Sequence, residues 1–326
     1  MTVMIPPFID CHHHIWDPKG DSHPWLAPDV AIPFRYGDYS AIKGRYLQAE
    51  YEADAGSMPV VGHVTMEGEW NEADPVAESR WIANVFAERP NYFAHVARAI
   101  LHAPDAGDVL AAHAAFPFVR GIRHKPVTVP TPDDLAGSPT KSARGSLNCR
   151  DWRRGYARLR HHGFHFELQA PWWHVRDLLD LISAHPETPI VLNHMFMPGT
   201  RAPEAMSGWR AAIDLAATAP NVVIKISGMG LPGRPWDLAD HRPLIDHVID
   251  RFGAERCMMA SNFPVDRLCG TFETIISGYA HATVHLSNNE RNALFWETAA
   301  RVYRIDTRNI AGVADPPRHR ETNCGS

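Results

Sequence analysis

The sequence has little of the features that mark specialised protein classes. It contains five cysteines in 326 residues, an odd number, widely spaced and without a CxxC pair. This pattern argues against a disulfide framework and against a thiolate zinc site. No window approaches eighteen uninterrupted apolar residues, and the first residues lack a basic stretch followed by an apolar run, so neither a membrane span nor an export signal is predicted. We therefore expect a cytoplasmic protein.

A large excess of charge of one sign is also missing. The chain has 32 Lys and Arg against 37 Asp and Glu, a formal net charge of −5, and no long run of either sign. Such a surface does not attract nucleic acid or an anionic membrane. A small-molecule partner is expected, and self-association into a homo-oligomer stays open.

What the sequence does contain is a regular alternation of apolar runs and amphipathic segments. Hydrophobic residues make up 45% of the chain, enough to bury a full core. Eight apolar runs lie at residues 7–15, 59–68, 92–100, 118–126, 164–171, 189–198, 221–230 and 256–266. Helix-like segments separate most of them, at 74–90, 108–117, 151–163, 175–186, 207–220 and 241–253. This order predicts an α/β fold, a (β/α)8 TIM-type barrel.

The same pattern predicts one domain. We expect a single barrel domain over residues 1–311, because no interior linker or low-complexity repeat interrupts it. Two proline-rich, polar excursions, near 17–58 and 126–150, follow predicted strands and are long enough to cover the barrel mouth. Residues 312–326 are predicted to be a mobile tail.

Three consecutive histidines stand in the first predicted strand. Side chains alternate along a strand, so His12 and His14 share one face, while Cys11 and His13 point the other way. His194 closes the stretch "IVLNH" of the sixth apolar run, and the carboxyl ends of barrel strands meet at one mouth. Three converging imidazoles suit zinc or a similar divalent ion. Other strand histidines are expected to be hydrogen-bonded in the core: His13, His63, His95 and His124.

The first strand also carries a family resemblance. The stretch "DCHHHIWDP" resembles the D-x-H-x-H-x-W signature that opens the amidohydrolase superfamily, in the branch with pyrone dicarboxylate lactonase and the sugar-acid lactonases. Further segments resemble that branch in the correct order, among them "VRGIRH", "FHFELQ", "IVLNHMFMP", "VVIKISGM" and "CMMASNFPVDRL". The resemblance implies an amidohydrolase barrel that hydrolyses an ester, lactone or amide. Relatives include decarboxylases and hydratases, so the family alone does not fix the reaction.

Some of the family's site residues have a match in this sequence and others do not. His12 and His14 match the family's first-strand pair, and His194 matches the histidine after its sixth strand, which binds metal or substrate. Gln169 stands where many amidohydrolases have a further metal-binding histidine, so a binuclear site is not expected. Asn262 stands where the family commonly has an aspartate that accepts the proton of the attacking water. An amide has no usable basicity near neutral pH.

Another carboxylate is therefore needed as the base. Glu67 ends the second predicted strand on the face of His63 and Thr65, and this orientation favours it slightly. Asp266 lies four residues after Asn262 and can reach back over the mouth; the alternative for Asp266 is a surface ion pair. Catalysis without metal also stays open, because the pyrone lactonase of this branch works in that way.

Residues around the predicted mouth indicate an anionic substrate. Arg123 lies in the fourth predicted strand and can pair with a carboxylate. Other predicted substrate contacts are Tyr36, Tyr39 and Arg35 of the first long loop, together with Gln169 and Trp16. Lys225, in the seventh predicted strand, needs an anionic partner, either Asp10, Glu167 or a substrate carboxylate.

The sequence thus predicts a hydrolase that opens a carboxylated lactone or related cyclic ester from aromatic or sugar-acid breakdown. The predicted cofactor is one divalent metal ion, zinc, held by the three histidines, with metal-free action as the alternative. A metal-dependent decarboxylase of the same superfamily is the first competing function. The second is a binding protein that has lost its base at Asn262.

Overall fold

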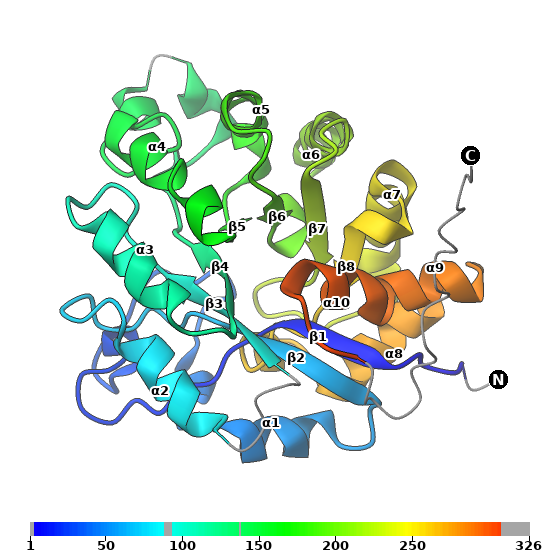
Figure 1. Ribbon diagram of the computed structural model, residues 1–326. Helices are drawn as coiled ribbons and strands as arrows, with labels where there is room; N and C mark the ends of the chain where they lie inside the picture. Colours follow the sequence, from blue (N-terminus) through cyan, green and yellow to red (C-terminus); the bar gives the residue numbers. More distant parts are fainter. Residues whose placement is uncertain (1–2, 88–92, 137, 308–326) are drawn as a thin grey trace, which may run out of the picture.

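The computed structural model describes residues 3–87, 93–136 and 138–307. The predicted tail, 312–326, lies outside these described residues. Eight parallel strands form one sheet in the order β1 to β8, each hydrogen-bonded to the next along the chain. They are β1 (Phe8–His13), β2 (Val60–Met66), β3 (Phe93–Arg98), β4 (Val119–Arg123), β5 (His165–Leu168), β6 (Ile190–Leu192), β7 (Val222–Ile226) and β8 (Cys257–Met259). The predicted (β/α)8 barrel is confirmed (Figure 1).

The ends of β1 and β8 close the barrel. The backbone N–H of Asn262 donates to the carbonyl of His12 at 2.8 Å, and that of His14 donates to the carbonyl of Phe263 at 2.7 Å. Below them, the buried carboxylate of Asp10 accepts bonds from the backbone and hydroxyl of Ser261. The first and last strands are therefore joined where their functional side chains begin.

One helix follows each strand around the outside of the barrel (Figure 1). These are α1 (Gln48–Ala55), α2 (Ala77–Val85), α3 (Ala106–Ala114), α4 (Arg150–Tyr156), α5 (Val175–Ala184), α6 (Pro203–Ala217), α7 (Leu238–Phe252) and α8 (Phe272–Ala282). Two shorter helices, α9 (Asn288–Asn292) and α10 (Thr298–Tyr303), complete the chain that is described. No helix in the described ranges has the length and apolar character needed to cross a membrane.

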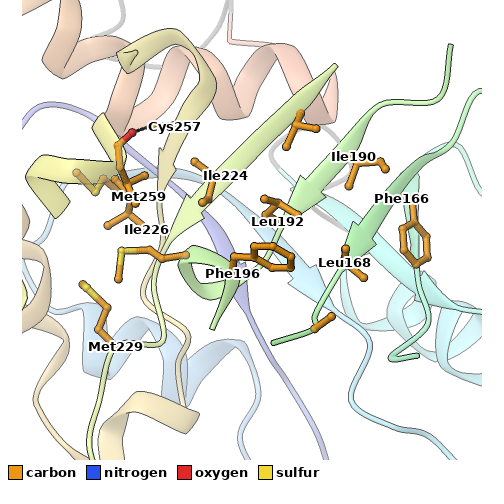
Figure 2. Packing of buried hydrophobic residues seen from close by; sticks show 14 of the residues in the cluster. Phe166, Leu168, Ile190, Leu192, Phe196, Ile224, Ile226, Met229, Cys257 and Met259 are labelled. Carbon is orange, nitrogen blue, oxygen red and sulfur yellow. Dashed lines mark hydrogen bonds between the residues drawn. The ribbon is translucent and has the colours of Figure 1, made fainter. Parts of the chain in front are cut away.

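The main core lies between the barrel wall and the helices. Figure 2 shows its part on β5 to β7, where Phe166, Ile190, Leu192 and Ile224 pack together. Alternate residues face the barrel interior, so each strand is buried on both sides. This explains why the strands appear in the sequence as almost continuous apolar runs.

A bulge in β1 changes the predicted direction of one side chain. Asp10 pairs with His63 and His13 pairs with Thr65, so Cys11 and His12 together lie opposite Val64 alone. One extra residue in a strand breaks the strict alternation of side chains. Cys11 consequently packs with the interior residues, and the prediction that it points with His13 is wrong.

A buried ion pair fills the barrel interior below the mouth. Lys225 lies 3.0 Å from Glu167, and both side chains are completely buried. Burial raises the pKa of Glu167, but Lys225 and the hydrogen bonds from His165 and Tyr303 lower it to about 2. Glu167 is therefore the partner of Lys225 among the three that the sequence left open.

Candidate active site

A cavity of about 280 Å³ lies at the carboxyl ends of the strands. Side chains from several strand ends and from the loop after β1 line it. The polar lining residues are His14, Arg35, Glu67, Glu69, Arg123, Lys125, Gln169, His194 and Asn262. The apolar lining comes mainly from Trp16, Trp25, Phe34, Met197 and Val265. Most of the predicted site residues therefore meet at one place.

The three predicted histidines form one cluster, in which His14 and His194 line the cavity and His12 lies buried against both rings. The ring centroids of His12 and His14 are 5.3 Å apart, and those of His12 and His194 are 4.5 Å apart. His13 points away and hydrogen-bonds to His63 at 2.9 Å. The prediction that His12 and His14 lie together, away from His13, is confirmed.

Each of the three clustered imidazoles is held neutral. Burial lowers the pKa of His12, His14 and His194 well below 6.5, and nearby cations lower it further. The leading cation is Lys225 for His12 and Arg35 for His194. At neutral pH each ring therefore has one N–H donor and one lone pair.

Lys225 determines which nitrogen of His12 carries the proton. Its ammonium lies 3.4 Å from Nδ1 of His12. An ammonium only donates, so Nδ1 accepts and Nε2 keeps the proton. Nε2 of His12 is buried and has no hydrogen-bond partner among the described residues. The cluster therefore holds a buried N–H group without a partner among the described residues, directly behind the histidines that line the cavity.

This arrangement does not fit the predicted zinc ion. Within the part of the chain that the structure describes, no three His, Cys, Asp or Glu side chains are placed to hold a metal. The protonated Nε2 of His12 has no lone pair for a metal, and metal binding requires a deprotonated ligand atom. Lys225, Arg35 and Arg123 also add positive charge near the cluster. As placed here, these residues do not form the zinc site predicted on His12, His14 and His194, and the zinc ion stays a prediction.

His194 stands on a strained turn. Residues 194–197 all have positive φ, with His194 at 53°, in the left-handed region that ordinary residues seldom adopt. Gly228, at φ +60°, packs against this turn, and a Cβ there would lie 2.4 Å from Nδ1 of His194. The hydroxyl of Ser227 is 3.0 Å from the same nitrogen. The end of β7 thereby positions the ring of His194, and strain of this kind is common at functional sites.

Asn262 lines the cavity and is linked to Asp266 behind it. The amide of Asn262 donates to Oδ1 of Asp266 at 2.6 Å, and the hydroxyl of Tyr36 donates to the same oxygen at 2.8 Å. The other carboxylate oxygen, Oδ2, is buried and has no hydrogen-bond partner in the described ranges. Burial raises the pKa of Asp266 from 3.8 to about 6. Asp266 is thus a buried carboxylate poised near neutrality, and the surface ion pair considered as its alternative is not formed.

Glu67 and Arg123 pair with each other. Nε of Arg123 donates to Oε1 of Glu67 at 2.5 Å, and Nη2 donates to the Glu67 carbonyl at 2.7 Å. Oε2 of Glu67 accepts a bond from the backbone of Glu69. The third nitrogen of Arg123, Nη1, lies 3.2 Å from Oε1 of Gln169. Both side chains line the cavity, and each is held in place by its pairing with the other.

Of the remaining predicted substrate contacts, Trp16 lies in the cavity lining and Tyr39 does not. Trp16 lines the cavity, and its indole N–H donates to the carbonyl of Gly44. Tyr39 does not line the cavity, because its hydroxyl binds two carbonyl groups of its own loop. Sequence reasoning missed the ion pair of Lys125 and Glu69 at the cavity wall. The only available signal was the position of Lys125, two residues beyond the end of β4.

Comparison with known proteins agrees with this architecture. A family model described as Amidohydrolase matches residues 9–305. This chain belongs to the amidohydrolase family. The amidohydrolase is 34% identical over 303 residues to the uncharacterized protein y4mH of Sinorhizobium fredii, covering 91% of this chain and 98% of that protein. It is 26% identical to an L-fucono-1,5-lactonase of Burkholderia multivorans, with 91% and 96% of the two chains covered.

A solved structure has the same fold as the amidohydrolase. It is an amidohydrolase from Burkholderia multivorans with bound zinc, superposed with a TM-score of 0.73 at 23% identity, over 92% of this chain and 99% of that one. At this identity the likeness concerns the fold. The zinc belongs to that protein, whereas the His12 and Lys225 arrangement described above belongs to this one.

Proposed function

We propose that this amidohydrolase hydrolyses a carboxylated lactone or a related cyclic ester. The observation that carries the proposal is the site itself: neutral His14 and His194 line one small cavity, and His12 and the buried carboxylate of Asp266, whose pKa is near neutral, lie directly behind this lining. Imidazole N–H groups suit a carbonyl oxygen that gains negative charge, and the carboxylate suits the proton of an attacking water. The relationship to an L-fucono-1,5-lactonase supports the same class of bond.

The histidine cluster would stabilise the oxyanion. Water attacks the lactone carbonyl, and the oxygen of that carbonyl takes the negative charge. Nε2–H of His12 is a donor without a competing partner in the part of the chain that the structure describes, and the rings of His14 and His194 lie against that of His12. Neutral donors that are already in place need no reorganisation, and removal of one such donor costs about 10²–10³ in kcat. No step in this scheme passes through a metal ion.

We assign proton acceptance to Asp266 rather than to Glu67. Oδ2 of Asp266 is buried without a hydrogen-bond partner within the described ranges, and the pKa of about 6 leaves the carboxylate ionised at neutral pH while still basic. Both oxygens of Glu67 already accept hydrogen bonds. Asn262 lines the cavity in front of Asp266, so its amide oxygen would orient the water. The collapse of the tetrahedral intermediate breaks the ring C–O bond, and the alkoxide takes up the proton.

A second role follows for the Arg123 pair. With Glu67 as its fixed counter-ion, Arg123 forms the wall of the cavity together with Gln169 and Trp16. We propose that this wall contacts the substrate, and that Glu67 acts by positioning Arg123. Tyr36 acts by holding Asp266.

The test compares two isosteric variants on carboxylated five- and six-membered lactones, with acid release followed by pH-stat. Asp266→Asn is expected to lower kcat by about a hundredfold or more, the usual contribution of a general base. Glu67→Gln keeps an acceptor for Arg123 and should lower kcat by much less. The opposite order would make Glu67 the base.

The same assay separates the competing functions. Carbon dioxide release without ring opening would favour a decarboxylase. If the wild type is inert on all lactones while Asn262→Asp gains activity, the protein is a ligand-binding homologue.

We further propose a cytoplasmic enzyme with a small anionic substrate and no nucleic-acid or membrane partner. The cysteines within the described ranges are all free, which suits a reducing compartment. A homo-oligomer is part of this proposal, and sedimentation equilibrium tests it directly.

A further inference from the structure

A second, larger cavity adjoins the catalytic one. Its volume is about 860 Å³, against about 280 Å³ for the catalytic cavity. Arg35 and Met197 line both cavities and therefore mark their common boundary. Pockets for whole ligands usually measure roughly 300–1,000 Å³. The catalytic cavity alone is small for a ligand, and the two together offer room for a larger molecule.

The second cavity has a large apolar wall, and its charged lining residues are three arginines. Besides Arg35 these are Arg234, which pairs with Asp240, and Arg201, which donates to the carbonyls of Gly199 and Met229. Trp173, Met229 and Leu231 contribute to its wall, together with Pro171, Pro198 and Pro232. Aromatic and aliphatic walls with few charged groups bind the apolar part of a ligand. No part of the proposed hydrolysis uses this space.

Arg35 is the cation at the boundary that has no carboxylate partner. Arg123 pairs with Glu67 and Lys125 pairs with Glu69, whereas Arg35 forms no direct ion pair within the residues described and acts on the buried Asp266 only through its charge, which lowers the pKa of that carboxyl. Its guanidinium instead lies 4.6 Å from the centre of the Tyr36 ring. An unpaired guanidinium is suited to a planar carboxylate, which it can bind through two hydrogen bonds.

Gly228 allows Arg35 and His194 to lie close together at the boundary between the two cavities. A Cβ on Gly228 would lie 2.7 Å from Nη2 of Arg35 and 2.4 Å from Nδ1 of His194, so the absence of a side chain allows both groups to approach. The strained turn that carries His194 ends at Met197. A carboxylate on Arg35 would thus lie close to the catalytic histidine and beside the entrance to the second cavity.

We propose that the second cavity is a subsite for an apolar, ring-sized substituent of the substrate, and that Arg35 binds the substrate's carboxylate at the boundary. The substrate class is then a carboxylated lactone that carries an aryl group. This inference rests on the proposed lactone hydrolysis and deepens it.

Equilibrium binding tests the subsite without requiring turnover. The probes are tetrahydropyran-2-carboxylate, its 6-phenyl derivative and the carboxamides of both, cyclic ethers that have no lactone bond to hydrolyse. Calorimetry on the wild type is expected to show at least about tenfold tighter binding of the phenyl carboxylate than of the unsubstituted one, a difference of about 1.4 kcal/mol. Each carboxylate should also bind more tightly than its carboxamide.

Two kinds of variant assign these preferences to the residues. Leu231→Trp fills the second cavity and should abolish the preference for the phenyl carboxylate. If Leu231→Trp does not fold, the smaller change Leu231→Phe should still reduce this preference. The matched control is Leu215→Trp on the outer surface of α6, where Leu215 is 37% exposed; it should keep the preference. Arg35→Gln should remove the preference for carboxylate over carboxamide.

The outcomes separate the subsite from the proposed reaction. Equal binding of the phenyl and unsubstituted carboxylates, binding of neither, or a phenyl preference that persists in both Leu231 variants would overturn the subsite. A carboxylate preference that survives Arg35→Gln would overturn the role of Arg35. Failure to hydrolyse any lactone would instead reject the proposed function and leave these binding results intact.

Discussion

Replacement of the proposed base should make the protein more stable while it destroys activity. Burial raises the pKa of Asp266 from 3.8 to about 6, against the opposing effect of Arg35. A shift of about two pKa units corresponds to about 3 kcal/mol. Asp266→Asn removes the buried charge and keeps an oxygen that accepts the bonds from Tyr36 and Asn262. The variant should therefore be up to about 3 kcal/mol more stable at pH 8.

The sign of the pH dependence follows from the raised pKa of Asp266. Between pH 3.8 and about 6 the folded protein keeps a proton that the unfolded chain has released. The free energy of unfolding therefore falls as the pH rises through this window, and the loss remains at higher pH. The variant lacks this loss, so its advantage should be large at pH 8 and close to zero at pH 4. Asp10, whose pKa burial also raises to about 6, is present in both proteins and cancels in the difference.

Urea unfolding at pH 4, 5, 6, 7 and 8, followed by circular dichroism, measures this difference. The matched control is Asp29→Asn at an exposed position, which should change stability by no more than about 0.5 kcal/mol at any pH. A variant that is less stable than the wild type at pH 8, or an advantage that does not vary with pH, would refute the assignment of a strained, buried charge to Asp266.

Three further results are expected. The rate constant kcat/KM should fall about tenfold per pH unit below pH 6, as Asp266 takes up its proton, and an acid limb centred near pH 4 would contradict this. Lys225→Met should lower the free energy of unfolding, measured with urea, by about 3–5 kcal/mol because it leaves Glu167 buried without its cation. The double variant Lys225→Met with Glu167→Gln should recover much of this free energy. Gly228→Ala should cost about 1–2 kcal/mol and reduce kcat/KM by about a hundredfold, because its Cβ would displace His194; unchanged kinetics would show that the ring has room to move.

The barrel was predictable because both faces of each strand are buried. The apolar runs of 164–171, 189–198 and 221–230 predict strands directly, and the structure contains β5, β6 and β7 there. The helices α1 and α8 were not predicted. For α1 the reason is that Gln48–Ala55 is largely polar and lies inside an excursion that was interpreted as a mouth loop.

The histidine cluster was predictable for a similar reason. Strand alternation places His12 and His14 together, and barrel geometry brings the end of the sixth strand to the same mouth. The direction of Cys11 was not predictable, because a bulge depends on the register with the neighbouring strand.

The sequence could not show which distant residues pair with each other. Glu67 and Arg123 were interpreted separately, as a base and a substrate anchor, because a strand pattern shows which face a residue occupies and not which partner it selects. The position of the proton on His12 was beyond the sequence for the same reason, since it depends on Lys225, a residue 213 positions away.

The central claim is that neutral imidazoles and Asp266 hydrolyse a carboxylated lactone without a metal ion. The most direct test measures kcat/KM on such a lactone for enzyme stripped of metal with a chelator, verified by elemental analysis, before and after addition of one equivalent of zinc. The account predicts full activity in the stripped enzyme and no gain with zinc. Activity that disappears on stripping and returns with zinc would contradict it.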